Sequence, residues 1–190
     1  YRWSYKLSIS VIMSVFNGSA YLNESIESIL NQTFKDFEFL ILDDGSTDNS
    51  FEIIKKYSSL DSRIKHFRQK NMGLTRALNF LVKKSRNNFI ARMDADDFSE
   101  NIRLEHQYFF LKKNPDYSVV GSNSFLVDKY NYLLKKTKLP SSNFLIKTRL
   151  NYINSFIHSS IMFRKSKFNE AMGYDESIPR AQDFDLWLRM

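Results

Sequence analysis

Three aspartates lie within four positions of the sequence, directly after the apolar run "FIARM". They are Asp94, Asp96 and Asp97 of "DADD". Like charges crowded at the end of a buried strand must be held apart, hydrated or neutralised by a cation. In an extended segment, residues i and i+2 project to the same side, so the carboxylates of Asp94 and Asp96 would lie about 6–7 Å apart. One of these two carboxylates could then coordinate a metal, and the other could accept a hydrogen bond from a neighbouring hydroxyl. For Asp97 we favour a helix N-cap.

A second polar cluster, "LDDGSTDNS", follows the apolar run "FEFLIL" and contains Asp43, Asp44 and Gly45. A turn between a strand and a capped helix explains this cluster by itself. Its carboxylates could also accept hydrogen bonds from a nucleobase imide or ribose hydroxyls, and Gly45 would let a ligand approach the backbone. The sequence alone leaves both interpretations open, the capped turn and the ligand-binding cluster.

Apolar runs and helical periodicity alternate along the first half of the chain. This alternation predicts an α/β fold with a mainly parallel sheet, helices on both faces and right-handed crossovers. Ligands bind such sheets beyond the carboxyl ends of the strands, where "FNGS", "DDGSTD" and "DADD" would converge. The predicted strands are 7–13, 37–42, 64–68 and 88–93, and the predicted helices are 17–32, 50–57 and 74–84.

The second half of the sequence is less regular. A hairpin is expected over 125–136, with its turn at 128–131, and a last helix from 182. The other expected elements are helices over 101–113 and 141–150 and strands over 117–122 and 155–163. We expect one domain that is a fragment of a longer protein, because the chain starts at Tyr1 and ends within a helical pattern.

Composition excludes several classes of function. The chain has no cysteine, which rules out a disulfide framework, a thiolate zinc site and a cysteine nucleophile. Oxygen ligands alone favour Mg²⁺ or Mn²⁺ over zinc. The net charge of +7 invites a nucleic-acid partner, but the basic residues are dispersed in pairs, so we expect none. Attraction to an anionic membrane surface or substrate explains the charge equally well.

These motifs carry a resemblance to a known family. The segment from "SVIMSVFNGS" to "LDDGSTDNS", then "NMGLTRALN", "FIARMDADD" and "AQDFDLWLR", resembles the nucleotide-diphospho-sugar transferases of the Rossmann-like GT-A fold. More narrowly, it is similar to the inverting glycosyltransferases of family 2. The resemblance runs from about residue 7 to the end. It implies a nucleotide-binding half over about 7–97 and a small irregular acceptor-side half over about 98–190.

The resemblance also implies roles for individual residues. The backbone at Ser14–Phe16 would pack against the nucleobase, Asp44 would accept from the base imide with help from Asp43, and Arg76 would lie near phosphate or ribose. Asp94 would touch ribose or sugar, and Asp96 would hold the metal on the diphosphate. The residues implied to bind the donor are Ser14, Val15, Phe16, Asp43, Asp44, Gly73, Arg76 and Asp94.

The resemblance assigns the catalytic base to Asp183, with Asp185 as the rival carboxylate. The family has an acidic pair here, and Gln182 departs from it, because its amide supplies no charge. The alternative for Asp183 is that it caps the last helix. His158 and Arg164 also match a family segment, although His158 could be a satisfied polar residue at a strand end and Arg164 a surface cation.

The implied function is the transfer of a hexosyl or N-acetylhexosaminyl group, with inversion, from a nucleotide-sugar, with UDP the expected carrier. The acceptor would be a saccharide or lipid-linked saccharide in the synthesis of bacterial surface polysaccharide or glycolipid. We expect a cytoplasmic site of action with peripheral association at the inner face of the membrane. Three alternatives are a sugar-phosphate nucleotidyltransferase, a phosphatase with a D-x-D nucleophile and a basic nucleic-acid-binding module. A sugar-phosphate nucleotidyltransferase usually has a basic Gly-rich loop after its first strand. A phosphatase of this kind has its D-x-D pair after its first strand.

Overall fold

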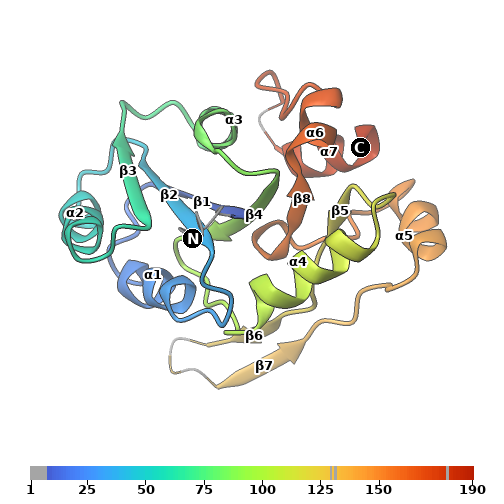
Figure 1. Ribbon diagram of the computed structural model, residues 1–190, viewed down its shortest axis with the longest axis horizontal. Coiled ribbons are helices and arrows are strands. Elements are labelled where there is room, and N and C mark those ends of the chain that lie inside the picture. Colours follow the sequence, from blue (N-terminus) through green and yellow to red (C-terminus); the bar gives the residue numbers. More distant parts are fainter. Residues whose placement is uncertain (1–7, 129, 131, 179) are drawn as a thin grey trace, which may run out of the picture.

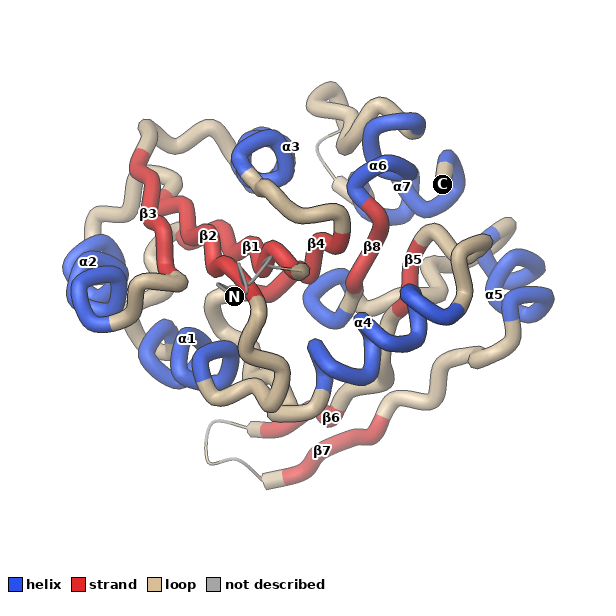
Figure 2. Tube along the Cα trace, viewed as in Figure 1, coloured by secondary structure: helices blue, strands red, loops and turns tan. Residues whose placement is uncertain are grey.

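A computed structural model describes residues 8–128, 130, 132–178 and 180–190 (Figure 1). Its centre is a six-stranded sheet in the order β3-β2-β1-β4-β8-β5, and β6 and β7 form a separate hairpin (Figure 2). Four neighbouring strands run parallel, while β8 is antiparallel to β4 and β5. The predicted fold class, a mainly parallel α/β sheet, is therefore confirmed. The strands are Ile9–Val15 (β1), Phe37–Asp43 (β2), Ile64–Arg68 (β3), Phe89–Asp94 (β4), Val119–Val120 (β5), Phe125–Val127 (β6), Leu133–Lys136 (β7) and Met162–Arg164 (β8).

Helices cover both faces of the sheet (Figure 1). One core cluster joins α1, α2 and α4 to the sheet through Ile26, Ile54 and Leu104. The other joins α3, α6 and α7 to the opposite face. Every residue of β2 is buried, which is the pattern of a parallel strand covered on both sides. The helices are Leu22–Leu30 (α1), Ser50–Leu60 (α2), Leu74–Lys84 (α3), Arg103–Lys113 (α4), Asn143–Leu150 (α5), Lys165–Glu170 (α6) and Gln182–Arg189 (α7), with a 3₁₀ turn at His158–Ser160 (η1).

Several predicted elements differ from the structure. The strand expected over 155–163 is instead η1 followed by the short β8, and α6 was not expected. The strand expected over 117–122 shrinks to two residues. The hairpin forms where predicted, although residues 129 and 131 of its turn lie outside the described part of the chain, as does residue 7 of the first predicted strand. In the described ranges, no helix combines the length and apolarity needed to cross a bilayer.

A buried carboxylate ties three elements together at the amino-terminal side of the sheet. Glu38 of β2 accepts hydrogen bonds from Ser10 Oγ at 2.7 Å, the Arg86 backbone N–H at 2.7 Å and Lys65 Nζ at 2.7 Å. Burial raises the pKa of Glu38, but these three donors and the Lys65 charge outweigh it, so the pKa lies below 4.5. Neighbouring β1 and β3 are thereby joined to the segment before β4 through one side chain.

We predict that Glu38→Gln lowers the free energy of unfolding at pH 7 by about 1–3 kcal/mol, because a buried acceptor for a charged donor is lost. The lowered pKa stabilises the fold above about pH 4.5, and this stabilisation disappears as pH falls through the folded-state pKa. The two proteins should therefore converge in acid. Urea titrations at several pH values measure the difference.

Glu52→Gln is the matched control, because Glu52 pairs with Lys55 on the exposed surface of α2. We expect its effect to stay within about 0.5 kcal/mol. A constant deficit of Glu38→Gln from pH 7 into acid would contradict the assigned role of the charge.

Candidate functional site

Strand register brings the predicted site segments to one edge of the sheet. At the carboxyl end of β1, Val15 is paired with Asp43 of β2, and Ser14 is paired with Asp94 of β4. Asp43 is in turn opposite Arg68 at the end of β3. The ends of four parallel strands therefore meet, as expected for a ligand-binding edge.

Asp43 is fully buried at this edge. Its Oδ1 accepts from the Ser46 N–H at 3.3 Å, and its Oδ2 lies 3.0 Å from Arg68 Nε in an ion pair that lacks hydrogen-bond geometry. The Arg68 guanidinium also lies over the Phe51 ring, 4.3 Å from its centroid. Arg68 is thus held by a carboxylate and a ring, and it compensates the buried charge of Asp43.

Asp44 is buried and accepts three hydrogen bonds from the loop before α3. Gln69 Nε2 and the Met72 N–H donate to Oδ1 at 2.7 and 3.0 Å, and the Gly73 N–H donates to Oδ2 at 2.8 Å. The resemblance had assigned Asp44 to a nucleobase imide. In the structure Asp44 also fixes residues 69–73, and Oδ2, with a single donor, keeps capacity for a second.

Two glycines shape this loop contact. Gly45 has φ +82°, and a Cβ there would meet the Asn71 backbone nitrogen at 2.7 Å. A close approach allowed by Gly45 is therefore made by the chain itself, and the expected approach of a ligand at this position stays a prediction. Gly73 has φ +87° and ψ 159°, a conformation essentially restricted to glycine, but a Cβ there would meet nothing within 4 Å.

The loop after β1 is fastened to the loop after β2. The Asn17 N–H donates to Ser46 Oγ at 3.0 Å, Asn17 Oδ1 accepts from the Thr47 N–H at 2.8 Å, and the Gly18 N–H donates to Ser50 Oγ at 2.9 Å. Phe16, at the start of this loop, is 54% exposed. Its ring is accessible to a planar ligand on a backbone that these bonds hold in place.

The acidic cluster after β4 is arranged differently from the prediction. The strand ends at Asp94, and Asp96 lies in a turn, so the expected extended D-x-D segment was wrong. Asp94 forms an ion pair with Arg92, whose side chain is 2% exposed. Arg92 Nη1 donates to one oxygen of Asp94 at 2.6 Å, and Nη2 donates to the other. Burial raises the pKa of Asp94, Arg92 opposes the rise, and the charges of Asp97 and Asp96 add to it.

Asp96 and Asp97 are both exposed beyond this pair. The N-cap expected for Asp97 was wrong, because α4 begins at Arg103 with Ile102 at its N-cap position. Within the described ranges, no three His, Cys, Asp or Glu residues cluster as a protein-made metal cage. The site nevertheless fits Mg²⁺ or Mn²⁺, because Mg²⁺ is usually bound by one or two carboxylates together with substrate phosphates and Mn²⁺ shares its preference for oxygen ligands.

Asp183 lies in the first turn of α7, and its orientation is fixed from a distant segment. Asn154 Nδ2 donates to Asp183 Oδ2 at 2.7 Å, and Asn154 Oδ1 accepts from the Phe156 N–H at 3.0 Å. The N-cap position belongs to Ala181, so the alternative that Asp183 caps the helix is excluded. Oδ1 of Asp183 has no hydrogen-bond partner among the described residues and can accept from a ligand.

Tyr174 and His158 are hydrogen-bonded to each other, and the Arg92 charge acts on both. Burial raises the pKa of Tyr174, Arg92 opposes the rise, and the charges of Asp183 and Asp94 add to it. His158 Nε2 lies 2.7 Å from Tyr174 Oη. Burial and the Arg92 charge lower the pKa of His158 to about 2, so His158 is neutral at physiological pH.

Two predicted residues have other partners. Arg76 Nε pairs with Glu176 at 3.1 Å on the surface. Arg164 donates to the carbonyls of Leu111 at 2.5 Å and Asn114 at 3.1 Å at the end of α4, which makes it a structural residue rather than a free surface cation.

Sequence reasoning missed Arg92, Asn154 and Tyr174. A signal existed for Arg92, because a lone cation inside an apolar strand needs a buried counter-charge. Asn154 lies before the antiparallel strand β8, whereas the polar clusters that mark the ligand edge in the sequence follow parallel strands. For Tyr174 no sequence signal distinguishes this tyrosine from the other nine.

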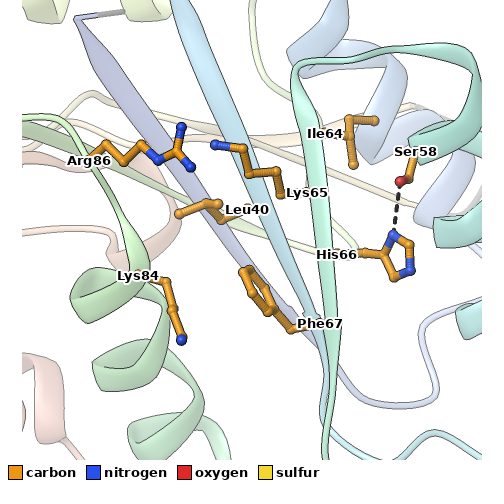
Figure 3. A pocket seen from close by; sticks show the side chains of 8 residues that line it. All are labelled: Leu40, Ser58, Ile64, Lys65, His66, Phe67, Lys84 and Arg86. Atoms are coloured by element: carbon orange, nitrogen blue, oxygen red, sulfur yellow. Dashed lines mark hydrogen bonds between the residues drawn. The ribbon is translucent and has the colours of Figure 1, made fainter.

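The two described hollows lie away from the Asp43 and Asp44 loops. One, of about 440 Å³, is lined by Tyr174 and Asp185 between α3 and α7. The other, of about 540 Å³, lies around β3 (Figure 3). There Lys84 and Arg86 surround the apolar side chains of Leu40 and Phe67, and the lining contains no carboxylate and no predicted site residue.

Comparison with known proteins decides the family. The family described as Glycosyl transferase family 2 matches residues 10–173, which include every predicted donor residue and Asp96. The chain belongs to glycosyltransferase family 2. The resemblance inferred from the sequence motifs is therefore confirmed.

Relatives within family 2 include the O-antigen biosynthesis glycosyltransferase WbnJ of Escherichia coli, 40% identical over 185 residues, which cover 96% of this chain and 71% of WbnJ. The uncharacterised glycosyltransferase MJ1057 of Methanocaldococcus jannaschii is 38% identical over 185 residues. Those residues cover 95% of this chain and 63% of MJ1057, so the chain spans less than two thirds of that relative.

Solved structures show the same GT-A fold. S. aureus TarS 1–349 in complex with UDP-GlcNAc matches with a TM-score of 0.73 at 21% identity, over 96% of this chain and 52% of that one. The mannosyltransferase PcManGT of Pyrobaculum calidifontis, in complex with GDP-Man and Mn²⁺, matches with a TM-score of 0.69 at 15% identity, over 92% and 49%. At these identities the likeness shows the fold of the family 2 chain and nothing further.

We predict that Gly45→Ala and Gly73→Ala destabilise the site loops unequally. Gly73→Ala introduces backbone strain alone, about 1–3 kcal/mol. Gly45→Ala adds a collision with the Asn71 backbone and should cost about 2–6 kcal/mol. Urea unfolding measures both variants. Gly18→Ala is the control for mild side-chain crowding without backbone strain, because Gly18 has no positive φ and its Cβ would meet Ala95 Cβ and Val15 Cγ1 at 3.3 Å. Equal losses at Gly45 and Gly73 would show that the Asn71 backbone yields.

Proposed function

We propose that this protein transfers a hexosyl or N-acetylhexosaminyl group, with inversion, from a nucleotide-diphospho-sugar to an acceptor hydroxyl. The observation that carries this proposal is Asp183, a carboxylate with one oxygen held by Asn154 and the other available, near the Asp94 edge. UDP is the proposed carrier, which is supported by the structures of TarS in complex with UDP and with UDP-GlcNAc. The O-antigen role in the name of WbnJ supports a part in surface polysaccharide or glycolipid synthesis.

In this proposal the donor lies across the carboxyl ends of β1, β2 and β4. The nucleobase packs on the backbone at Ser14–Phe16 and beside the exposed Phe16 ring. The base imide donates to the remaining capacity of Asp44 Oδ2, whose other contacts hold it still. Gly73 donates to Asp44 and places the start of α3 along the donor. Residues 7–97 would form the nucleotide-binding half and residues 98–190 the acceptor side.

Asp94 and Asp96 have different tasks in this arrangement. Both oxygens of Asp94 accept from Arg92, so its remaining lone pairs are suited to a ribose or sugar hydroxyl. Asp96 is exposed and forms no ion pair with a described residue, and it would hold Mg²⁺ or Mn²⁺ on the diphosphate. When bound, the metal would offset the negative charge that gathers on the leaving nucleotide. Arg76 could add a positive charge at the phosphates if it left Glu176, its partner in the structure.

Asp183 is the proposed catalytic base. A sugar hydroxyl is a weak nucleophile, so its proton must be removed as it attacks the anomeric carbon. The free Oδ1 of Asp183 would accept that proton while Asn154 holds Oδ2. Attack from the face opposite the nucleotide inverts the anomeric configuration. His158 is neutral and bonded to Tyr174, so it serves as packing and as a hydrogen-bond partner rather than as a cation.

The proposed acceptor is a saccharide or a lipid-linked saccharide, and the proposed place of action is the cytoplasmic side of the cell membrane. Nucleic acid is not a proposed partner.

We predict that chelation removes most of the affinity for UDP. The reason is that the diphosphate would otherwise meet the exposed negative charges of Asp96 and Asp97. Calorimetry with Mn²⁺, and again after addition of EDTA, measures the affinity. Asp96→Ala should weaken Mn²⁺-dependent binding by at least about tenfold. The matched control is Asp97→Ala, an equally exposed aspartate one position along, and equal losses in both variants would remove the specific role of Asp96.

We predict that Asp183→Asn lowers transfer by about 10²–10⁴-fold while the affinity for UDP stays near wild type. An asparagine can still accept from Asn154 through its oxygen, so folding should be preserved, but it cannot take the acceptor proton. Single-turnover transfer to a panel of acceptors measures the step.

Asp185→Asn is the control for this substitution, because Asp185 pairs with Arg189 within α7. Its transfer rate should remain within a few-fold of wild type. Wild-type transfer by Asp183→Asn, with loss in Asp185→Asn, would assign the base to the wrong carboxylate.

A further inference from the structure

Charge is distributed very unevenly along the chain. Residues 117–169 contain nine of the 28 basic residues and only one of the 21 acidic residues, Asp128. The remainder contains 19 basic and 20 acidic residues, so it is nearly neutral. The whole positive excess of the protein therefore comes from this one segment.

The same segment exposes an apolar hairpin. Strands β6 and β7 pair with each other and, in the described ranges, with no other strand. The hairpin lies at the rim of the molecule below α4, and an extended connection leads from it to α5 (Figure 1). All residues of both strands are exposed, and the large apolar ones are Phe125, Leu126, Val127, Leu133 and Leu134. An isolated two-stranded hairpin with such side chains is only marginally stable in water.

Cations and aromatic rings accompany these apolar side chains. Lys135, Lys136 and Lys138 form no ion pair with any described residue, and Lys136 Nζ lies 5.3 Å from the centroid of the Phe125 ring. Tyr132 is exposed beside them, and further along the chain α5 exposes Phe144 and Lys147. Unpaired lysines around exposed tyrosine, phenylalanine and leucine are the composition of a membrane-interface element.

We propose that the β6–β7 hairpin docks the protein on an anionic bilayer surface, with its apolar side chains at the headgroup boundary and its lysines on lipid phosphates. The occupant follows from charge: lysines near an anionic leaflet are attracted, whereas a second copy of the same hairpin would bring like charges together. The backbone stays at interfacial depth, where water satisfies its free edges. This inference extends the proposed function to a surface, and it depends on neither donor binding nor transfer.

Sedimentation with vesicles tests the charge. The full chain should bind vesicles of phosphatidylcholine with phosphatidylglycerol and not vesicles of phosphatidylcholine alone. Lys135→Gln with Lys136→Gln should weaken binding about 25-fold, since each lysine near the surface contributes about fivefold. The matched control is Lys83→Gln with Lys84→Gln in the last turn of α3, where Lys84 lines the hollow in Figure 3, and it should change binding by less than about threefold. No binding to anionic vesicles, or equal losses in the two double variants, would overturn the proposal.

Fluorescence locates the contact without removing any lysine. Tyr132→Trp should give blue-shifted emission on anionic vesicles, whereas Leu60→Trp at the end of α2 should give none. The two positions are 71% and 72% exposed, so they differ in location and not in initial accessibility. Binding with no shift at Tyr132 would place the membrane contact elsewhere and overturn the proposal. A dimer of the wild-type chain in solution that Leu134→Ser dissociates would assign this face to a second copy and would also overturn it.

Discussion

The ion pair between the buried guanidinium of Arg92 and the partly exposed carboxylate of Asp94 constrains the carboxyl edge of the sheet. A guanidinium inside a sheet has a desolvation cost of several kcal/mol unless a counter-charge is hydrogen-bonded to it. Asp94 provides that counter-charge with both oxygens, so the carboxylate is held at the strand end. Burial, assisted by the Arg92 charge, lowers the pKa of His158, and the same charge opposes the rise that burial causes in the pKa of Tyr174. One cation thus holds a carboxylate of β4 and acts on side chains from the segments on either side of β8.

Around this pair, the loops at the edge are held largely by contacts with one another. Asp44 binds the backbone before α3, Asn17 joins the loops after β1 and β2, and Asn154 holds Asp183. Each contact connects segments far apart in the chain. A ligand entering such an edge meets groups that are already oriented, so little binding energy is lost in ordering them. The same bonds explain why acidic side chains remain buried here without unfolding the edge.

The parallel half of the fold was readable from the sequence because its signals are local. The run "FEFLIL" is buried on both faces, and the polar clusters follow their strands directly. Local signals failed at 155–163, where Ser160 Oγ donates to the Ile157 carbonyl at 2.9 Å and favours a turn over a strand. The partners of Asp44 and Asp183 were also unpredictable, because each contact depends on how distant segments pack. The family resemblance proposed Asp183 as the base, but nothing in the local sequence pointed to Asn154 as its partner.

Strands β5 and β8 lie side by side, although a long excursion containing the hairpin and α5 separates them in the chain. Val119 is opposite Phe163, and Val120 is opposite Met162. The entropy of closing such a loop rises only slowly with its length, so insertions or deletions in the excursion should disturb the sheet very little. Related chains can therefore diversify in the hairpin part of this segment while keeping the strand ends unchanged. The end of the excursion is different, because Leu150 packs in the core and Asn154 holds Asp183, so length is free to vary at the hairpin and fixed next to the site.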